Sequence, residues 1–406
     1  MALICRRCIH DEDLRNILEH KAIMAKCNYC GKKGLAIEMN DIAEVIDPYL
    51  RKYCCLGEEV PRFDGDDDNV EYVREGDDLI YFLQEELGMD QDPVDDLIKI
   101  LQSIDPADPR DGGEEFYDKW EPYQRNYVSS REYHENWKEF ADGIKHGRRF
   151  FDEVAKIRLE RILGKPGSQV ALELPFIELG RGKQVQAVYR ARRADSESEA
   201  EKFLKNPRKE LRPPESDKAI SGRMNPAGIA VFYGALTEET AIVEVRPFVG
   251  SLVVVGRFNL KRKLRLLNLA MIGSGYTGSI FNPEYENRAA RLHFLQSFHA
   301  LIVKPVQPCE ELLEYLPTQA VAEYVSNILG FDGILYASAQ AGYVKDAEGG
   351  VHWELKENKM KLYNIVLFGK ALDTFSFARS SAKVMKITSI KYDFSTQPLL
   401  GRDLEE

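Results

Sequence analysis

The spacing of apolar residues predicts a mainly helical N-terminal part. Residues 77–87 and 93–104 carry apolar side chains three and four positions apart, the pattern of a helix with one buried face. Residues 129–163 continue this pattern with several aromatic side chains, and residues 11–25 have the pattern of a short amphipathic helix. Residues 103–115 are rich in Pro, Asp and Gly, which predicts a loop.

The remainder of the chain alternates short apolar runs with helical stretches. We predict strands at residues 170–179, 185–191, 228–233, 252–258, 264–269, 333–337, 363–368 and 384–392, and helices at residues 282–303 and 318–329. Residues 164–169 have the composition of a linker, and the charged residues 197–212 are expected to form a short helix or a lid. Strands mixed with helices in this order predict an α+β fold in which helices flank a mixed sheet.

Four of the seven cysteines have the spacing of a metal site, C-x2-C-x18-C-x2-C: Cys5, Cys8, Cys27 and Cys30. Each pair can present two thiolates to one metal ion, and four thiolates complete a tetrahedral coordination sphere. We therefore predict a structural zinc site. Cys54 and Cys55 are expected to be core or surface thiols, since adjacent cysteines rarely share one tetrahedral site.

These patterns divide the 406 residues into four expected segments. They are a zinc-binding knuckle at residues 1–57, a helical domain at 58–165, an α+β domain at 166–380 and a tail at 381–406. No run of 18 apolar residues is present, and the N-terminus lacks the apolar run of a signal peptide. Together with cysteine usage that suggests reduced thiols, this predicts a cytoplasmic protein without membrane contact.

The formal charge of −11 is unevenly distributed. Residues 58–121 contain 23 acidic and 5 basic side chains, whereas residues 181–304 contain 21 basic and 12 acidic ones. The acidic middle argues against an extended nucleic-acid surface in that part of the chain. The basic segment suits an anionic ligand such as a dinucleotide pyrophosphate, although a charge excess is also compatible with a solvated face.

Residues 222–247 place three chemically distinctive side chains at nearly even spacing. Arg223 precedes the strand predicted at residues 228–233, Tyr233 ends it, and Glu244 falls on the helix that Thr237 is expected to cap. The three side chains could converge on one cleft. An ordinary strand–turn–helix with an exposed arginine and glutamate explains the same spacing.

The chain also resembles the RES family, which is named for its arginine, glutamate and serine. The resemblance covers about residues 185 to 369 and rests on R-x9-Y-x10-E, Thr318-Gln319, the GILYAS run ending at Ser338, the upstream Tyr189-Arg190-Ala191-Arg192 and the strand 364–368. It implies an ADP-ribosyltransferase-like fold that consumes NAD, often as a bacterial toxin beside an antitoxin.

The resemblance implies a role for each motif residue. Glu244 would stabilise a ribosyl oxocarbenium ion, because cationic charge develops there when the nicotinamide–ribose bond breaks. Arg223 and Arg190 would bind the pyrophosphate, and Tyr233 or Tyr189 would form an aromatic wall for nicotinamide. Ser338 and Gln319 would complete the site; Ser338 would hydrogen-bond ribose or the carboxamide.

A knuckle and a helical region ahead of this domain resemble the HEPN-type region of longer RES proteins. Active HEPN nucleases carry an arginine and a histidine separated by four to six residues. Arg125 and His134 are separated by eight residues, and Arg131 and His134 by two, so neither pair fits. The helical region is therefore expected to be a non-catalytic scaffold, and ribonuclease activity is the weaker alternative.

The sequence leaves the acceptor of the ADP-ribosyl group open. Water would give an NAD glycohydrolase, inorganic phosphate an NAD phosphorylase and a protein side chain a mono-ADP-ribosyltransferase. A different alternative is an inactive, zinc-stabilised binding module. The expected partners are NAD, an antitoxin or immunity protein and a second copy of the chain, and a toxin or an anti-phage effector is the expected biological role.

Overall fold

The computed structural model describes residues 2–63, 70–104, 116–150, 152–166, 174–304, 306–307, 309–338 and 363–390. The chain divides into two compact units. Unit 1 consists of Met1–Glu132 and Tyr276–His293, and unit 2 of Tyr133–Gly275 and Phe294–Glu406. The boundaries expected at residues 57 and 165 fall inside unit 1 and unit 2, respectively.

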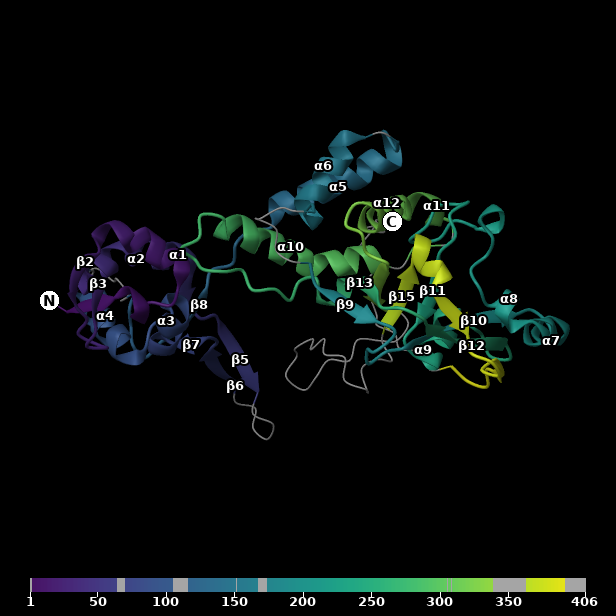
Figure 1. Cartoon of the computed structure of the whole chain (residues 1–406), viewed down its shortest axis with the longest axis horizontal. Helices are drawn as coiled ribbons and strands as arrows, with labels where there is room; N and C mark the ends of the chain where they lie inside the picture. The colour runs from purple at the N-terminus through teal and green to yellow at the C-terminus, as the bar shows by residue number, and fades with distance from the viewer. Residues whose placement is uncertain are drawn as a thin grey trace, which may run out of the picture. The chain divides into compact units, whose positions relative to one another are not determined.

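Unit 1 combines helices with small antiparallel sheets (Figure 1). Its sheets are β1-β3-β2 (Leu3–Cys5, Lys33–Glu38, Ile23–Lys26), β4-β8-β7 (Cys54–Leu56, Pro122–Arg125, Asp77–Asp78) and the hairpin β5-β6 (Glu59–Phe63, Val70–Arg74). Its complete helices are α1 (Glu12–Leu18), α2 (Met39–Tyr53), α3 (Leu79–Leu87) and α4 (Gln91–Ile104), and it also contains the first part of α10 (Tyr285–Val303).

One hydrophobic core runs through unit 1. It joins Ile4 and Leu14 near the N-terminus to Leu97 on α4 and to Phe281 and Tyr285, which lie far along the chain. The stretch expected as a separate knuckle therefore shares its core with the helices that follow. The helical domain expected at residues 58–165 also contains four strands among its described residues, β5, β6, β7 and β8.

Several helices of the N-terminal part differ from their predicted lengths. The helix expected at residues 11–25 ends at Leu18, and residues 23–26 form β2 instead. The region 129–163 is two helices, α5 (Arg131–His146) and α6 (Glu153–Leu163). Asp152 precedes the second helix and caps it, because its carboxylate accepts the N–H groups of Val154 and Ala155. Most of the predicted loop at residues 103–115 lies outside the described residues.

Unit 2 is built on a nine-stranded mixed sheet with the order β16-β12-β10-β11-β15-β14-β13-β9, in which β17 also pairs with β12. The strands are β9 (Phe176–Leu179), β10 (Ala187–Ala194), β11 (Phe232–Ala235), β12 (Leu252–Leu260), β13 (Leu264–Asn268), β14 (Gly333–Ala337), β15 (Tyr363–Leu367), β16 (Phe375–Phe377) and β17 (Lys383–Lys386). Only β13 and β14 pair in parallel among these strands; the other pairs are antiparallel. The predicted α+β class is confirmed.

Helices flank this sheet on both faces. They are α7 (Glu197–Lys205), α8 (Pro207–Glu210), α9 (Glu238–Glu244), the second part of α10, α11 (Glu311–Glu314) and α12 (Leu316–Asn327) (Figure 1). Ala241 on α9 packs against Ala191 and Val255 on one face, whereas Phe203 on α7 packs with Val254 and Phe258 on the other. Among the described residues, no helix is long and apolar enough to cross a membrane.

The strand predicted at residues 228–233 is shifted toward the C-terminus. Residues 228–231 are turn and irregular backbone, and β11 begins at Phe232. Gly333 is the first residue of β14. A Cβ at this position would be 2.2 Å from the carbonyl oxygen of Val366 on the neighbouring strand. The glycine therefore permits a close approach of two strands.

Candidate active site and metal site

The sheet of unit 2 is divided between β10 and β11. β10 pairs with β12 over eight residues, from Ala187 to Ala194, but its register with β11 contains a single pair, Tyr189 and Ala235. Beyond that pair the two strands separate, while β11 stays paired with β15 on its other edge from Phe232 to Ala235. Gly234 allows this close approach, because a Cβ there would lie 2.8 Å from the Tyr189 carbonyl oxygen.

A cavity of about 440 Å³ opens where β10 and β11 separate. Four residues predicted to form the site line it: Arg190, Arg223, Tyr233 and Glu244. The cavity is also lined by Arg246, Glu311, Tyr315 and Tyr336, among others. The structure thus brings together an arginine before β11, a tyrosine on it and a glutamate on the next helix.

Glu244 is the last residue of α9. Thr237 caps the start of this helix as predicted, since its hydroxyl accepts the N–H of Thr240 at 3.2 Å. At the other end, one carboxylate oxygen of Glu244 accepts two hydrogen bonds, from Ser338 Oγ at 3.0 Å and from Asn364 Nδ2 at 2.8 Å. Both donors use Oε2, so among the described residues the second oxygen is left available to a ligand. Ser338 therefore contacts the glutamate, not the cavity.

Asn364 was not predicted as a site residue. It is 1% exposed on β15, and its Oδ1 is buried without a hydrogen-bond partner among the described residues. The amide orientation follows from chemistry, because a carboxylate can only accept and the NH2 group must face it. The sequence contains a weak signal for this residue, a polar position inside an otherwise apolar buried strand.

Arg223 is held by backbone carbonyl groups. Its Nη1 donates to the carbonyl oxygen of Ile302 at 2.7 Å and its Nη2 to that of Lys304 at 2.9 Å. The guanidinium also lies over the ring of Tyr315, 4.9 Å from the ring centre. Among the described residues, no carboxylate lies within ion-pair distance of Arg223, so its charge is not neutralised by an acidic side chain.

The loop that carries Arg223 is organised by Asn225, a second residue that sequence reasoning missed. Its Nδ2 donates to the carbonyl oxygens of Ile220, Pro226 and Ile229, and its Oδ1 accepts the hydroxyl of Tyr233 at 2.9 Å. The Tyr233 hydroxyl in turn accepts the N–H of Met224 at 2.8 Å. Tyr233 thus contributes its ring to the cavity and its hydroxyl to the loop, and burial raises the pKa of that hydroxyl.

Arg190 lies on β10 at the point of separation. Its Nη1 donates to the Tyr233 carbonyl oxygen at 3.3 Å, and its guanidinium stacks over Phe232. No acidic partner for it is found among the described residues. Burial and, to a smaller extent, the neighbouring charge of Arg192 lower the pKa of Arg190 to about 10. An arginine in this setting is stabilised by an anion in the cavity.

Two predicted ligand contacts are placed elsewhere by the structure. Gln319 is buried on α12, and its Nε2 donates to Ser221 Oγ at 2.9 Å and to the Gly222 carbonyl oxygen at 2.8 Å. It supports the Arg223 loop from behind. Tyr189 packs against the α9 side of the sheet and does not line the cavity. The aromatic lining instead comes from Tyr233, Tyr315 and Tyr336.

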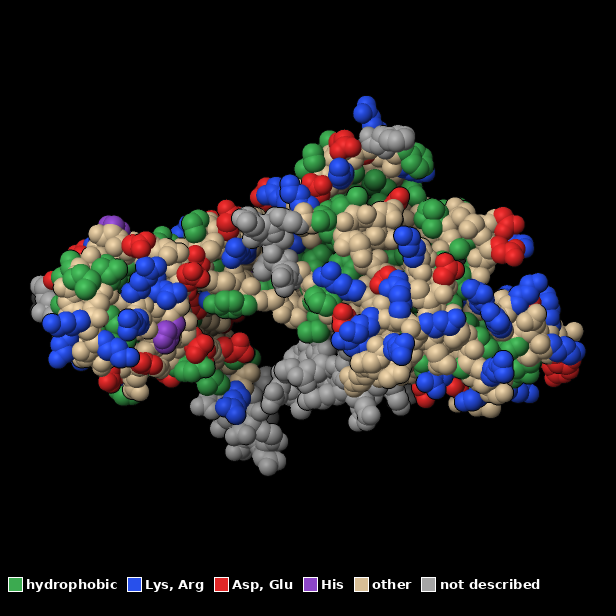
Figure 2. All heavy atoms as spheres, in the orientation of Figure 1, with side chains coloured by type: hydrophobic (Ala, Val, Ile, Leu, Met, Phe, Trp, Pro, Cys, Tyr) green, Lys and Arg blue, Asp and Glu red, His purple; other side chains and the backbone are tan. Residues whose placement is uncertain are grey.

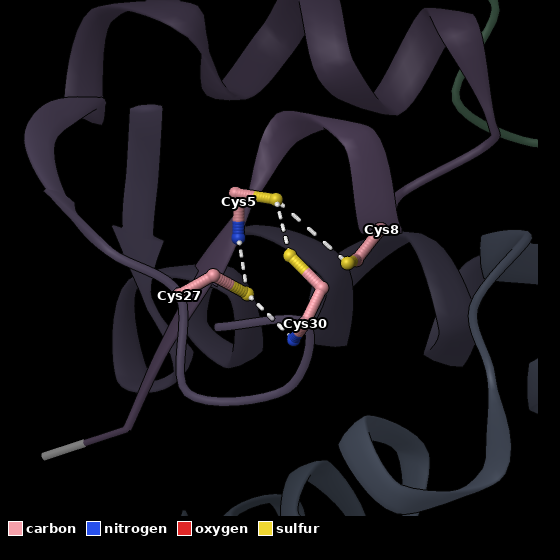
Figure 3. A group of neighbouring side chains, drawn as sticks. All are labelled: Cys5, Cys8, Cys27 and Cys30. Carbon is pink, nitrogen blue, oxygen red and sulfur yellow. Dashed lines mark hydrogen bonds between the residues drawn. The ribbon is translucent and has the colours of Figure 1, made fainter. Parts of the chain in front are cut away.

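The four predicted metal ligands lie together in unit 1 (Figure 3). The sulfur atoms of Cys5, Cys8, Cys27 and Cys30 are all within 4.8 Å of one another. Cys5 Sγ is 3.7 Å from Cys8 Sγ and 3.5 Å from Cys30 Sγ. A tetrahedral zinc site with Zn–S bonds of about 2.3 Å has sulfur atoms about 3.8 Å apart, so the group fits a metal ion.

The backbone also prepares this group for a metal. Burial opposes ionisation of Cys27, but the N–H groups of Cys30 and Cys5 point at its sulfur and lower the pKa of its thiol to about 6. Cys54 and Cys55 lie outside the group, as expected, and Cys54 is buried in the core of unit 1.

Arg125, considered above as a nuclease residue, has a structural environment in unit 1. Its Nε and Nη2 form a paired contact with the buried carboxylate of Glu86 at 2.6 and 2.9 Å. Its Nη1 donates to Thr277 Oγ1 and to the Gly278 carbonyl oxygen. Burial raises the pKa of Glu86, while the hydrogen bonds from Arg125 act in the opposite direction. Arg125 therefore donates its hydrogen bonds to groups within unit 1.

Comparison with protein-family models finds one domain in each part of the chain. Residues 187–383 match the RES domain, and residues 20–156 match HEPN/RES N-terminal domain 1. No curated protein and no solved structure matches the chain. The chain therefore carries a RES domain preceded by a HEPN/RES N-terminal domain, which confirms the resemblance seen in the sequence.

Proposed function

We propose that the chain cleaves the nicotinamide–ribose bond of NAD in the cavity between β10 and β11. The observation that carries this proposal is the environment of Glu244. Its carboxylate is fixed through one oxygen by Ser338 and Asn364, beside two arginines that have no acidic partner among the described residues. The RES domain match supports NAD as the substrate.

Each side chain has a role in this reaction. Arg190 and Arg223 would bind the pyrophosphate, because guanidinium groups without carboxylate partners favour a bound phosphate. Tyr233, Tyr315 and Tyr336 would surround the flat nicotinamide ring. The C1′–N bond breaks with its electron pair moving to the nicotinamide ring, which loses its positive charge. The free oxygen of Glu244 would stabilise the cation left on the ribose.

The products depend on the acceptor that attacks C1′. Water gives ADP-ribose and a proton, and inorganic phosphate gives ADP-ribose phosphate, so the chain would be an NAD glycohydrolase or an NAD phosphorylase. Transfer to a protein side chain is the alternative. The open cavity can admit a small acceptor or an exposed side chain of another protein. The proposal therefore includes both kinds of acceptor.

The rest of the proposal concerns the N-terminal region and the cellular role. We propose that the four cysteines hold a structural zinc ion, which would cross-link the end of β1 and the turn after it to the turn between β2 and β3. The HEPN-like region would be a scaffold, because Arg125 is engaged by Glu86. A cytoplasmic toxin or anti-phage effector restrained by an antitoxin fits this enzyme, since depletion of NAD arrests growth.

The direct test is incubation of the purified full chain with NAD, with and without phosphate, followed by resolution of the products by mass. We expect release of nicotinamide, and loss of turnover of about a hundredfold or more in Glu244→Ala. Glu239→Ala is the matched control, because Glu239 is exposed on the same helix. Arg223→Ala should first weaken NAD binding, by about 1.5–3 kcal/mol. Wild-type turnover in Glu244→Ala would refute the assignment.

A further inference from the structure

A second hollow, of about 880 Å³, adjoins the cavity and shares Arg190 with it. We call it the basic cleft. Its lining combines part of β10 with α8 and the turn that follows α8. It contains six cationic side chains: Arg190, Arg192, Arg208, Lys209, Arg212 and Lys218. Figure 2 shows lysine and arginine side chains gathered over the end of unit 2 that carries α7 and α8.

The cations of the basic cleft outnumber its anions. Three acidic residues line it, and two of these are already paired: Glu210 with Arg192 at 3.4 Å and Glu215 with Lys218 at 2.5 Å. Among the described residues, no carboxylate lies within ion-pair distance of the other three α8-side cations, Arg208, Lys209 and Arg212. The cleft therefore has a net positive potential where it meets the cavity.

The wall of the basic cleft is held in place by its own packing. Arg192 stacks on the ring of Phe203 at 4.4 Å and donates to the Glu210 carbonyl oxygen at 2.8 Å. Leu211, which directly follows α8, is fully buried in the core of unit 2. Two prolines then stiffen the turn after Arg212. The cations are thus presented from an anchored segment.

Arg190 and Arg192 are two residues apart on β10, so they point to the same face of the sheet. Two positive charges on one face repel each other unless an anion lies between or beside them. Arg190 has no acidic partner among the described residues, and Arg192 has a single carboxylate at 3.4 Å. An anion at the junction of cavity and cleft would relieve this repulsion.

We propose that the basic cleft is a phosphate-binding site that extends the cavity on the far side of Arg190. Phosphate suits it, because planar guanidinium groups bind phosphate oxygens in pairs of hydrogen bonds. The phosphate has two candidate sources, the pyrophosphate of the dinucleotide or a free inorganic phosphate. The choice between these sources rests on the proposed function, whereas the anion site itself does not.

The test uses the full chain and the double variant Arg208→Ala/Arg212→Ala, in which two exposed cations are removed without stranding a carboxylate. The control is Lys202→Ala/Arg379→Ala, which changes the net charge equally at exposed positions outside the cleft. Binding of inorganic pyrophosphate and of inorganic phosphate is measured by calorimetry. We expect the double variant, and not the control, to bind one of them about fivefold to tenfold more weakly.

Two further ligands distinguish the sources. If the cleft takes the phosphates of the dinucleotide, the double variant binds NAD more weakly but binds nicotinamide riboside, which has no phosphate, as the wild type does. If it takes free phosphate, NAD affinity is retained and the loss is confined to inorganic phosphate.

The remaining outcomes are also decisive. Equal binding of both anions by the double variant and the control overturns the proposal, as does a wild-type protein that binds neither anion. A protein that shows the expected anion binding but releases no nicotinamide from NAD would retain the phosphate site and refute the proposed function.

Discussion

Two half-buried arginines, one in each unit, show how the same side chain acquires different roles. In unit 1, Arg125 meets the buried carboxylate of Glu86 through two hydrogen bonds and also binds the loop at Thr277. In unit 2, Arg190 meets a single backbone carbonyl at 3.3 Å and the face of Phe232. Arg125 is satisfied within the protein, whereas Arg190 is left with hydrogen-bonding capacity for an anion.

The contrast extends to the whole of each site. The four cysteine sulfurs of unit 1 face one another and would close a coordination sphere around a metal. The Glu244 carboxylate has both of its hydrogen bonds from the described residues on one oxygen, Oε2. Polar groups whose hydrogen bonds are complete stabilise a fold, whereas polar groups with unused hydrogen-bonding capacity are candidates for ligand binding.

The largest effect is expected at the closed cysteine site. Metal analysis should find about one zinc ion per chain, lost in Cys27→Ser/Cys30→Ser. Because metal binding contributes directly to folding in such sites, by about 10 kcal/mol or more in small zinc domains, unit 1 of the variant should unfold or aggregate. The control Cys55→Ser/Cys309→Ser removes two thiols outside the group and should keep its metal. Unchanged metal content in the first variant would contradict the site.

The two arginines themselves give the next test. Arg125→Met should lower the free energy of unfolding by about 3–5 kcal/mol, because it leaves the Glu86 carboxylate buried without its partner. Arg190→Met strands no carboxylate and should cost less than about 1 kcal/mol. Denaturant unfolding of both variants measures the difference. Equal losses in the free energy of unfolding would show that Arg190 stabilises the fold as much as Arg125 does.

Much of this fold and part of the site were predictable from the sequence. The cysteine group and the α9 helix with its Thr237 cap were predicted from short-range spacing, whereas the expected convergence of Arg223, Tyr233 and Glu244 rested on spacing together with the resemblance to the RES family. Spacing is informative for these residues because they lie at the ends of consecutive elements. The chain brings those ends close together.

The supporting residues could not be predicted in the same way. Asn364 reaches Glu244 across 120 positions of sequence, and Gln319 reaches Ser221 across 98. These two contacts depend on the pairing of β11 with β15 and on the packing of α12. The periodicity of apolar residues predicts neither the strand pairing nor the helix packing. The position of β11 was missed because the apolar run at residues 228–231 includes residues that hold the Arg223 loop through Asn225.

A buried neutral group in unit 2 gives a third test. His299 accepts the N–H of Ala337, next to Ser338, at 3.1 Å through Nε2, and burial lowers the pKa of its imidazole to about 4. The unfolded chain takes up this proton near pH 6.5, whereas the folded state does so only near pH 4. Stability is therefore present above pH 6.5 and is lost as the pH falls to 4, by about 3 kcal/mol.

This pH dependence is measured by denaturant unfolding of the wild type and of His299→Gln, whose amide oxygen can still accept the Ala337 N–H. The variant does not titrate at this position, so its stability should fall less between pH 7 and pH 4. Parallel curves for the two proteins would show that His299 does not contribute to acid sensitivity.

The smallest effect concerns the two donors to the bound oxygen of Glu244. Asn364→Ala should lower turnover of NAD by about tenfold, or about 1.4 kcal/mol, because one charge-assisted hydrogen bond is lost. NAD affinity should change less, since Asn364 does not line the cavity. Asn268→Ala is the matched control, because Asn268 is also a buried asparagine on a strand of the same sheet.

Ser338→Ala should be milder still, since Asn364 continues to hold the same oxygen. The double variant Ser338→Ala/Asn364→Ala releases the carboxylate completely, so its loss should exceed the product of the two single losses. Strictly independent effects would mean that the two donors do not act through Glu244, and the contrast between a half-open and a closed polar site would then lose its clearest example.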